Sequence, residues 1–186
     1  MSTNNIENNN LNITLMIDAT GSMSATLDAL IPALKQLCLV LPLFVKATFH
    51  LAIYRDFDCK NEMIYKQYEP FESHDMMKMI KIISETIATG GGDSAECQKY
   101  AFGNLLEEIP TDAKTIVFHF TDAPPHSFPF PTSGSTDNHY LEGLKLKINN
   151  LPSDWINLCQ KYKDRQIPVY TIGSIESSSY SYYALM

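Results

Sequence analysis

The stretch of sequence that decides the fold is "ITLMIDATGSMSATLDALIPALKQL", Ile13–Leu37. It begins with a short run of mostly apolar residues, which is typical of a buried strand and ends on Asp18. Thr20, Ser22 and Ser24 follow at a spacing of two residues, and apolar residues at helical spacing come after them. A carboxylate and three hydroxyl groups at this junction have two interpretations: they cap the helix, or they hold a metal ion.

Apolar runs of strand length alternate with helical patterns along the rest of the chain. The predicted strands are 12–17, 47–54, 62–68, 114–122 and 167–173, and the predicted helices are 25–41, 74–87, 94–109, 139–149 and 153–165. This alternation predicts an α/β fold, a doubly wound and mostly parallel sheet with helices on both faces. The segment 62–68 alternates in polarity and is predicted to be an antiparallel edge strand.

The chain of 186 residues is the length of one domain. We predict a flexible Asn-rich tail over 1–11, a single domain over 12–175, and a C-terminal tail or truncated final element over 176–186. Within the domain, Ser153 is predicted to cap the helix that follows it, and Glu96 to be the acid of a capping box or an acidic residue in the first turn of its helix.

Charge and composition exclude several classes of protein. The net charge is −7 and no run of Lys or Arg occurs, which argues against binding to nucleic acid or to an anionic membrane. The N-terminus lacks the basic and apolar regions of a signal peptide, and no apolar run reaches the roughly 20 residues of a membrane span. The four cysteines are far apart and form no CxxC pair, so a zinc site is not predicted. These features favour a cytoplasmic location.

Oxygen-bearing side chains follow several of the predicted strands. Asp18 ends the first strand, Asp122 ends the fourth, and "GGGDSAE" (Gly90–Glu96) opens a helix between them. The carboxyl ends of parallel strands share one edge of the sheet, so these segments are expected to meet there. Carboxylate and hydroxyl oxygens suit a hard cation, which predicts Mg²⁺, with Ca²⁺ or Mn²⁺ as alternatives.

Three motifs in this order resemble a von Willebrand factor A-type domain: "DATGSMS", "TGGGDSAE" and "FHFTDAPPH". The first and third match the metal-ion-dependent adhesion site of that family, and the resemblance covers roughly residues 12–175. With "GGGD" and "DAPPH", the chain is similar to intracellular members of the family, including those joined to alpha-kinase domains. The resemblance implies a Rossmann-like three-layer sandwich and a metal held by Asp18, Thr20, Ser22 and Asp122, with Asp93 in the place of the family's middle-loop Thr.

Asp93 is a departure from the family pattern. With Asp18 and Asp122 it would place three carboxylates around a divalent ion and leave the site anionic. An anionic site repels an acidic ligand at close range. We therefore expect tight metal binding and weaker capture of an acidic ligand than in adhesive members of the family.

Five further residues are candidates for contact with a partner: Ser24, Arg55, Asp56, His126 and Phe128. Each has a structural alternative. Ser24 would cap the helix, Arg55 and Asp56 would pair or fix loops, His126 would decorate its loop, and Phe128 would fold back on the domain. A further histidine, His119, lies inside a predicted strand and is expected to be packed in the core.

The leading functional hypothesis is a metal-dependent protein-binding module that is not an enzyme and belongs to a larger protein or complex. A linked kinase domain would lie outside this chain. One alternative is a Mg²⁺-dependent phosphotransfer, hydrolase or phospho-receiver domain, although no P-loop lysine motif or nucleophile elbow occurs. A receiver domain also needs a Lys after the fifth strand, where this chain has "TIGS". The other alternative is a structural domain with a degenerate metal site.

Overall fold

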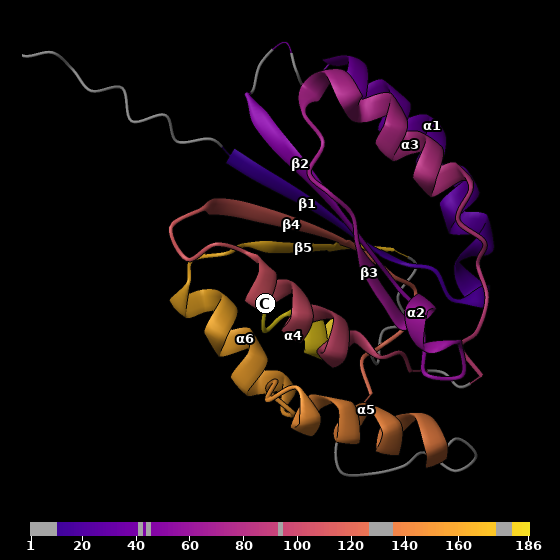
Figure 1. The fold of residues 1–186 in the computed structure, drawn as a ribbon, viewed down its shortest axis with the longest axis vertical. Coiled ribbons are helices and arrows are strands. Elements are labelled where there is room, and N and C mark those ends of the chain that lie inside the picture. Colours follow the sequence, from indigo (N-terminus) through magenta and orange to yellow (C-terminus); the bar gives the residue numbers. More distant parts are fainter. Residues whose placement is uncertain (1–10, 41–42, 44–45, 93–94, 127–135, 174–179) are drawn as a thin grey trace, which may run out of the picture.

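The computed structural model describes residues 11–40, 43, 46–92, 95–126, 136–173 and 180–186 (Figure 1). Its centre is a five-stranded sheet in the order β3-β2-β1-β4-β5. The strands are β1 (Leu11–Asp18), β2 (Ala47–Tyr54), β3 (Tyr65–Gln67), β4 (Lys114–Phe120) and β5 (Val169–Ile172). All neighbouring pairs are parallel except β2 and β3, which are antiparallel. The predicted fold class, including the antiparallel edge strand, is confirmed.

Helices cover both faces of this sheet (Figure 1). They are α1 (Ser24–Val40), α2 (Asn61–Ile64), α3 (Met76–Ser84), α4 (Gln98–Glu108), α5 (Thr136–Ile148), α6 (Trp155–Asp164) and α7 (Tyr180–Tyr183). Helices α1 and α3 lie side by side on one face, and α4, α5 and α6 lie on the other. The architecture is therefore a three-layer α/β sandwich.

Two hydrophobic cores lie on opposite faces of the sheet. On β1, Leu15 faces the core beneath α1 and α3, and the next residue, Met16, faces the core beneath α4 and α6. Both side chains are almost completely buried, at 2% and 0% exposed. A central strand that is covered on both faces needs apolar residues at nearly every position, which explains the continuous apolar run before Asp18.

The predicted helix starts differ from the structure by one to four residues, and three of these differences change the role of a named residue. Ser24 has helical dihedral angles and continues a 3-10 turn over Gly21–Met23, so its predicted capping role is wrong. The N-cap of α6 is Asp154, whose carboxylate accepts a hydrogen bond from Asn157 N at 2.9 Å, in place of Ser153. Helix α4 begins at Gln98, four residues later than predicted.

The late start of α4 has a clear physical cause. Glu96 is in an extended segment that forms a parallel bridge with Pro125. Glu96 N donates to Pro124 O at 3.0 Å, and His126 N donates to Glu96 O at 3.2 Å. Because the N–H and C=O groups of Glu96 bond to this neighbouring segment, Glu96 is not part of a helix. Its predicted place in a first turn is therefore wrong.

A separate observation concerns membranes. In the part of the chain that the structure describes, every helix is too short or too polar to cross a bilayer.

Candidate metal centre

Asp18 ends the central strand and is completely buried. Its Oδ1 accepts hydrogen bonds from Thr20 N at 2.9 Å and from Thr20 Oγ1 at 2.7 Å. Its Oδ2 accepts from Thr121 Oγ1 at 2.7 Å and from the Tyr54 hydroxyl at 3.3 Å. Burial raises the pKa of this carboxyl above its ordinary value, although the Thr20 and Thr121 bonds act in the opposite direction.

The loop after β1 meets the loop after β4 through a second carboxylate. Ser22 Oγ donates to Asp122 Oδ1 at 2.9 Å, and Ser22 Oγ lies 3.5 Å from Thr20 Oγ1. Ser22 is exposed and Asp122 is half-buried, whereas Asp18 and Thr20 are buried. The structure thus brings four of the five predicted ligands into one chain of oxygen atoms that runs from the interior to the surface.

The glycine-rich segment packs against this cluster. Gly21 N donates to Gly90 O at 2.9 Å, and Thr89 N donates to Ala19 O at 3.0 Å. Gly90 and Gly91 have positive φ angles of 82° and 80°. The expected approach of the middle segment to the first motif is therefore present.

Asp93 lies outside the described residues, so its role as a ligand stays a prediction. Among the residues that the structure describes, no three His, Cys, Asp or Glu side chains converge as a metal site. The expected site differs from such a cluster because half of its described donors are hydroxyl groups. A set of two carboxylates and two hydroxyls fits the chemistry of a hard cation such as Mg²⁺.

A network of buried polar side chains extends from Asp18 into the interior of the protein. The Tyr54 hydroxyl lies 2.9 Å from His119 Nε2, and His119 Nδ1 lies 3.3 Å from Thr171 Oγ1. His119 is completely buried, and this burial lowers its pKa to about 3. The prediction that His119 is a core residue is confirmed.

Further residues of this network were not found from the sequence. The Gln98 amide donates to Thr121 Oγ1 at 3.3 Å and to Ala123 O at 2.8 Å. The Tyr183 hydroxyl donates to Gln98 Oε1 at 3.0 Å and also to Ala123 O. The one sequence signal was the position of Thr121 directly before Asp122, at the end of a predicted strand.

The predicted partner-contact residues lie in different environments. Ser24 is exposed, and Phe128 lies outside the described residues. Arg55 is 8% exposed and donates to Ile87 O at 2.8 Å and to Met63 O at 3.4 Å. Asp56 is completely buried, with Oδ1 3.7 Å from His126 Nε2. For Arg55 and Asp56, the alternative that they hold loops together agrees with these contacts.

His126 is 1% exposed, so it neither lines the rim of the site nor decorates a loop. Its Nδ1 lies 3.0 Å from Glu142 Oε2, and the same oxygen lies 3.6 Å from Lys99 Nζ. Glu142 is completely buried and also accepts a hydrogen bond from Tyr100 N at 3.0 Å. Through Glu142, His126 therefore connects α5 to the loop that contains Asp122, a role that the sequence did not reveal.

Comparison with known proteins supports the fold and leaves the family open. No family model matches the chain. Two solved structures of the pilus adhesin SpaC from Lactobacillus rhamnosus GG are similar to it, with TM-scores of 0.59 and 0.52 at 13% and 12% identity. These matches cover 88% and 87% of this chain and 24% and 23% of the adhesin chains, and at such identities the likeness concerns the fold alone.

One curated relative matches by sequence. The chain is 31% identical over 163 residues to a putative ariadne-like RING finger protein of Acanthamoeba polyphaga mimivirus. The match covers 87% of this chain and 16% of the relative, so the chain spans about a sixth of that protein's length. The fold and the site together define an α/β domain. A cluster of carboxylate and hydroxyl side chains lies at the edge of its sheet where the parallel strands end.

Proposed function

We propose that this chain is a metal-dependent protein-binding module of the von Willebrand factor A type, without enzymatic activity of its own. The ligands of the proposed Mg²⁺ are Asp18, Thr20, Ser22 and Asp122, together with Asp93. The observation that carries the proposal is the chain of oxygen atoms that joins the loop after β1 to the loop after β4.

The electrostatics of the cluster support a bound cation. The buried Asp18 carboxyl has a raised pKa, so its ionised form is disfavoured until a positive charge is placed beside it. A divalent ion would provide that charge, and the exposed Ser22 marks the side from which a partner's oxygen would approach.

The surroundings of the histidines support a binding module over an enzyme. His119 has a pKa of about 3 and faces Tyr54 and Thr171, so it is a weak base at neutral pH. His126 is engaged with Glu142 inside the protein. Neither imidazole is placed to activate a nucleophile at the Asp18–Asp122 edge.

The proposal is tested by thermal unfolding during titration with Mg²⁺, Ca²⁺ and Mn²⁺. Binding to the folded state raises the melting temperature by mass action. The wild type and an Asp112→Asn control, at an exposed turn, are expected to respond alike, whereas Asp122→Asn is expected to lose the response. A wild type that responds to none of the three ions would favour the structural domain with a degenerate site.

A second titration tests the charge of the site. With metal bound, an acidic peptide is expected to bind weakly at the ion, and Asp93→Ala is expected to strengthen that binding because it removes one negative charge. Metal-dependent capture of the peptide that Asp93→Ala leaves unchanged would contradict the anionic site.

We also propose that the module works inside the cell as part of a larger protein. Cys59, Cys97 and Cys159 are free thiols, which suits a reducing compartment. The RING finger relative is a much longer protein in which the matched segment is a small part, which supports a role as one module among others.

A further inference from the structure

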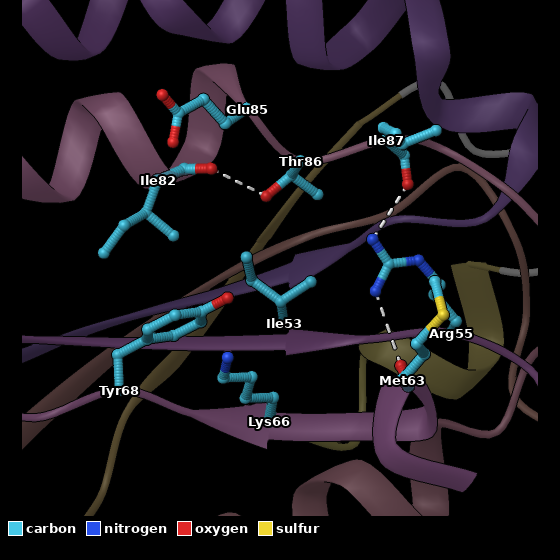
Figure 2. Close-up of a pocket in the computed structure, with 9 residues that line it drawn as sticks. All are labelled: Ile53, Arg55, Met63, Lys66, Tyr68, Ile82, Glu85, Thr86 and Ile87. Carbon is cyan, nitrogen blue, oxygen red and sulfur yellow. Dashed lines mark hydrogen bonds between the residues drawn. The ribbon is translucent and has the colours of Figure 1, made fainter. Parts of the chain in front are cut away.

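A groove with a volume of about 780 Å³ lies between the β2–β3 edge of the sheet and the C-terminal end of α3 (Figure 2). The residues that line it are Ile53, Arg55, Met63, Lys66, Tyr68, Ile82, Glu85, Thr86 and Ile87. Its volume is within the usual range of ligand sites, which is roughly 300–1,000 Å³. None of these residues is among the proposed metal ligands.

The floor of the groove is apolar. Ile53 lies at its centre, with the end of α3 on one side and Lys66 and Tyr68 on the other (Figure 2). Ile82 of α3 lines the same space, and Ile87 at the rim is 74% exposed. A surface of this kind favours an aliphatic or aromatic side chain from a partner.

Arg55 lies at one end of the groove (Figure 2), and no carboxylate of the described residues lies within ion-pair distance of it. It is 8% exposed, and its two terminal nitrogens donate to the backbone carbonyls of Met63 and Ile87. Its Nε is buried without a hydrogen-bond partner among the described residues. A guanidinium whose terminal nitrogens bond only backbone carbonyls is stabilised further by an anion placed beside it.

Lys66 provides a second cation beside the floor. Its Nζ lies 4.7 Å from the centroid of the Tyr68 ring, and within the described part of the chain it too has no ion pair. The one carboxylate of the lining, Glu85, has a 65% exposed side chain and lies 3.7 Å from Lys81 Nζ. The groove therefore has an excess of positive charge, on a chain whose net charge is −7.

We propose that this groove docks an acidic peptide segment of a partner protein. An apolar side chain of the segment fills the floor over Ile53 and Ile82, and adjacent carboxylates face Arg55 and Lys66. This surface is additional to the proposed metal centre, and docking requires no metal ion. The acidic character of the rest of the chain restricts an acidic partner to the few places with uncompensated positive charge.

The test is selection from a displayed library of random short peptides against the full chain in the presence of EDTA. The enriched peptides are expected to place Asp or Glu next to a large apolar residue. Binding of the best synthetic peptide, measured by fluorescence anisotropy, is expected to weaken about tenfold or more in Lys66→Glu. It is expected to strengthen in Glu85→Lys, which removes the one carboxylate of the lining.

Two matched variants serve as controls. Lys147→Glu makes the same charge change on the exposed surface of α5 and is expected to leave peptide binding unchanged. Asp122→Asn is expected to abolish the metal response and to leave peptide binding intact, so failure of the groove and failure of the metal centre are separate results. Melting temperatures of all the variants show whether each is folded.

Several outcomes would overturn the proposal. These are a library that yields no binder, enriched peptides without carboxylates, and peptide binding that Lys66→Glu leaves unchanged. Concentration-dependent dimerisation that Lys66→Glu abolishes would assign the groove to a second copy of the chain. Competition by inorganic phosphate at concentrations comparable to those of the peptide would assign it to a small anion.

Discussion

The buried carboxylate of Asp18 dominates the electrostatics of the candidate metal centre. It is fully enclosed at the end of the central strand, and four donor groups from Thr20, Thr121 and Tyr54 contact its oxygens. The pKa of the carboxyl is nevertheless raised, because desolvation outweighs these hydrogen bonds. Without a cation, the ionised form of Asp18 therefore reduces the stability of the folded state.

Substitution of Asp18 by Asn tests this conclusion. An acid whose pKa is raised by folding destabilises the folded state above that pKa, so Asp18→Asn is expected to raise the metal-free melting temperature by a few degrees at neutral pH. The gain should shrink as the pH falls through the folded-state pKa. In Mg²⁺ the order should reverse, because the variant lacks a proposed ligand. A metal-free variant less stable than the wild type at neutral pH would show that the hydrogen bonds of Asp18 outweigh its desolvation.

His119 provides a second test at the scale of one residue. Burial lowers its pKa to about 3, so below the ordinary value of about 6.5 the unfolded chain binds a proton that the folded chain does not. The folded state therefore has its full stability with respect to this group above pH 6.5. As the pH falls from 6.5 towards 3, the free energy of unfolding decreases by at most about 1.4 kcal/mol per pH unit. In urea unfolding, His119→Gln should therefore lose less stability than the wild type between about pH 6 and pH 4. His74→Gln, at a side chain that is 80% exposed, should follow the wild type.

At the scale of elements, the sequence predicted most of the strands and helices and was less accurate at their ends. The strand over 47–54 matches β2, whereas the predicted strand over 62–68 is strand only in β3, because Asn61–Ile64 form helix α2. These elements follow from local apolar periodicity. Glu96 was misplaced because its backbone pairs with Pro124 and His126, and no local pattern reports a contact between loops some thirty residues apart.

The segment that contains Gly90 and Gly91 tests how loops position the site. Gly91 has a φ of 80°, and a Cβ there would lie 2.6 Å from Glu96 Oε1 and 3.0 Å from Thr20 Cβ. Gly91→Ala is therefore expected to cost at least about 1 kcal/mol in chemical denaturation and to weaken the response to Mg²⁺. Gly143→Ala in α5, where a Cβ would meet nothing within 4 Å, should be neutral or stabilising by up to about 1 kcal/mol. Equal effects of the two substitutions would refute the close packing around Gly91.

At the scale of the whole molecule, the site is assembled from segments that are far apart in the sequence. Asp18 and Asp122 were predicted because each ends a predicted apolar strand, and Thr20 and Ser22 because they follow Asp18 at the spacing of the motif that resembles the von Willebrand factor A-type metal site. Thr121 also lies at the end of a predicted strand, but Gln98 and Tyr183 give no such signal, since their roles arise only when the chain folds and brings the C-terminal residues to the centre. His126 was misjudged for the same reason, because its partner Glu142 belongs to a distant helix.

The contact between the C-terminal residues and the loop after β4 leads to the last prediction. The Tyr183 hydroxyl bonds Gln98 Oε1 and the carbonyl of Ala123, the residue after Asp122. Tyr183→Phe keeps the ring contacts with His119 and Trp155 and removes only the hydroxyl. The buried Gln98 Oε1 then loses its donor, while Ala123 O keeps the hydrogen bond from the Gln98 amide, so the free energy of unfolding should fall by about 1–2 kcal/mol.

The same substitution should also weaken Mg²⁺ binding, measured by calorimetry, because the backbone next to Asp122 is less firmly held. Tyr182→Phe is the matched control, since Tyr182 contributes its backbone carbonyl to Trp155 Nε1 at 2.8 Å and that bond survives the substitution. If Tyr183→Phe loses stability but keeps its metal affinity, α7 has no influence on the metal centre. Loss of both, together with an unaffected Tyr182→Phe variant, would indicate that the C-terminal residues help to hold the Asp122 loop in place for the ion.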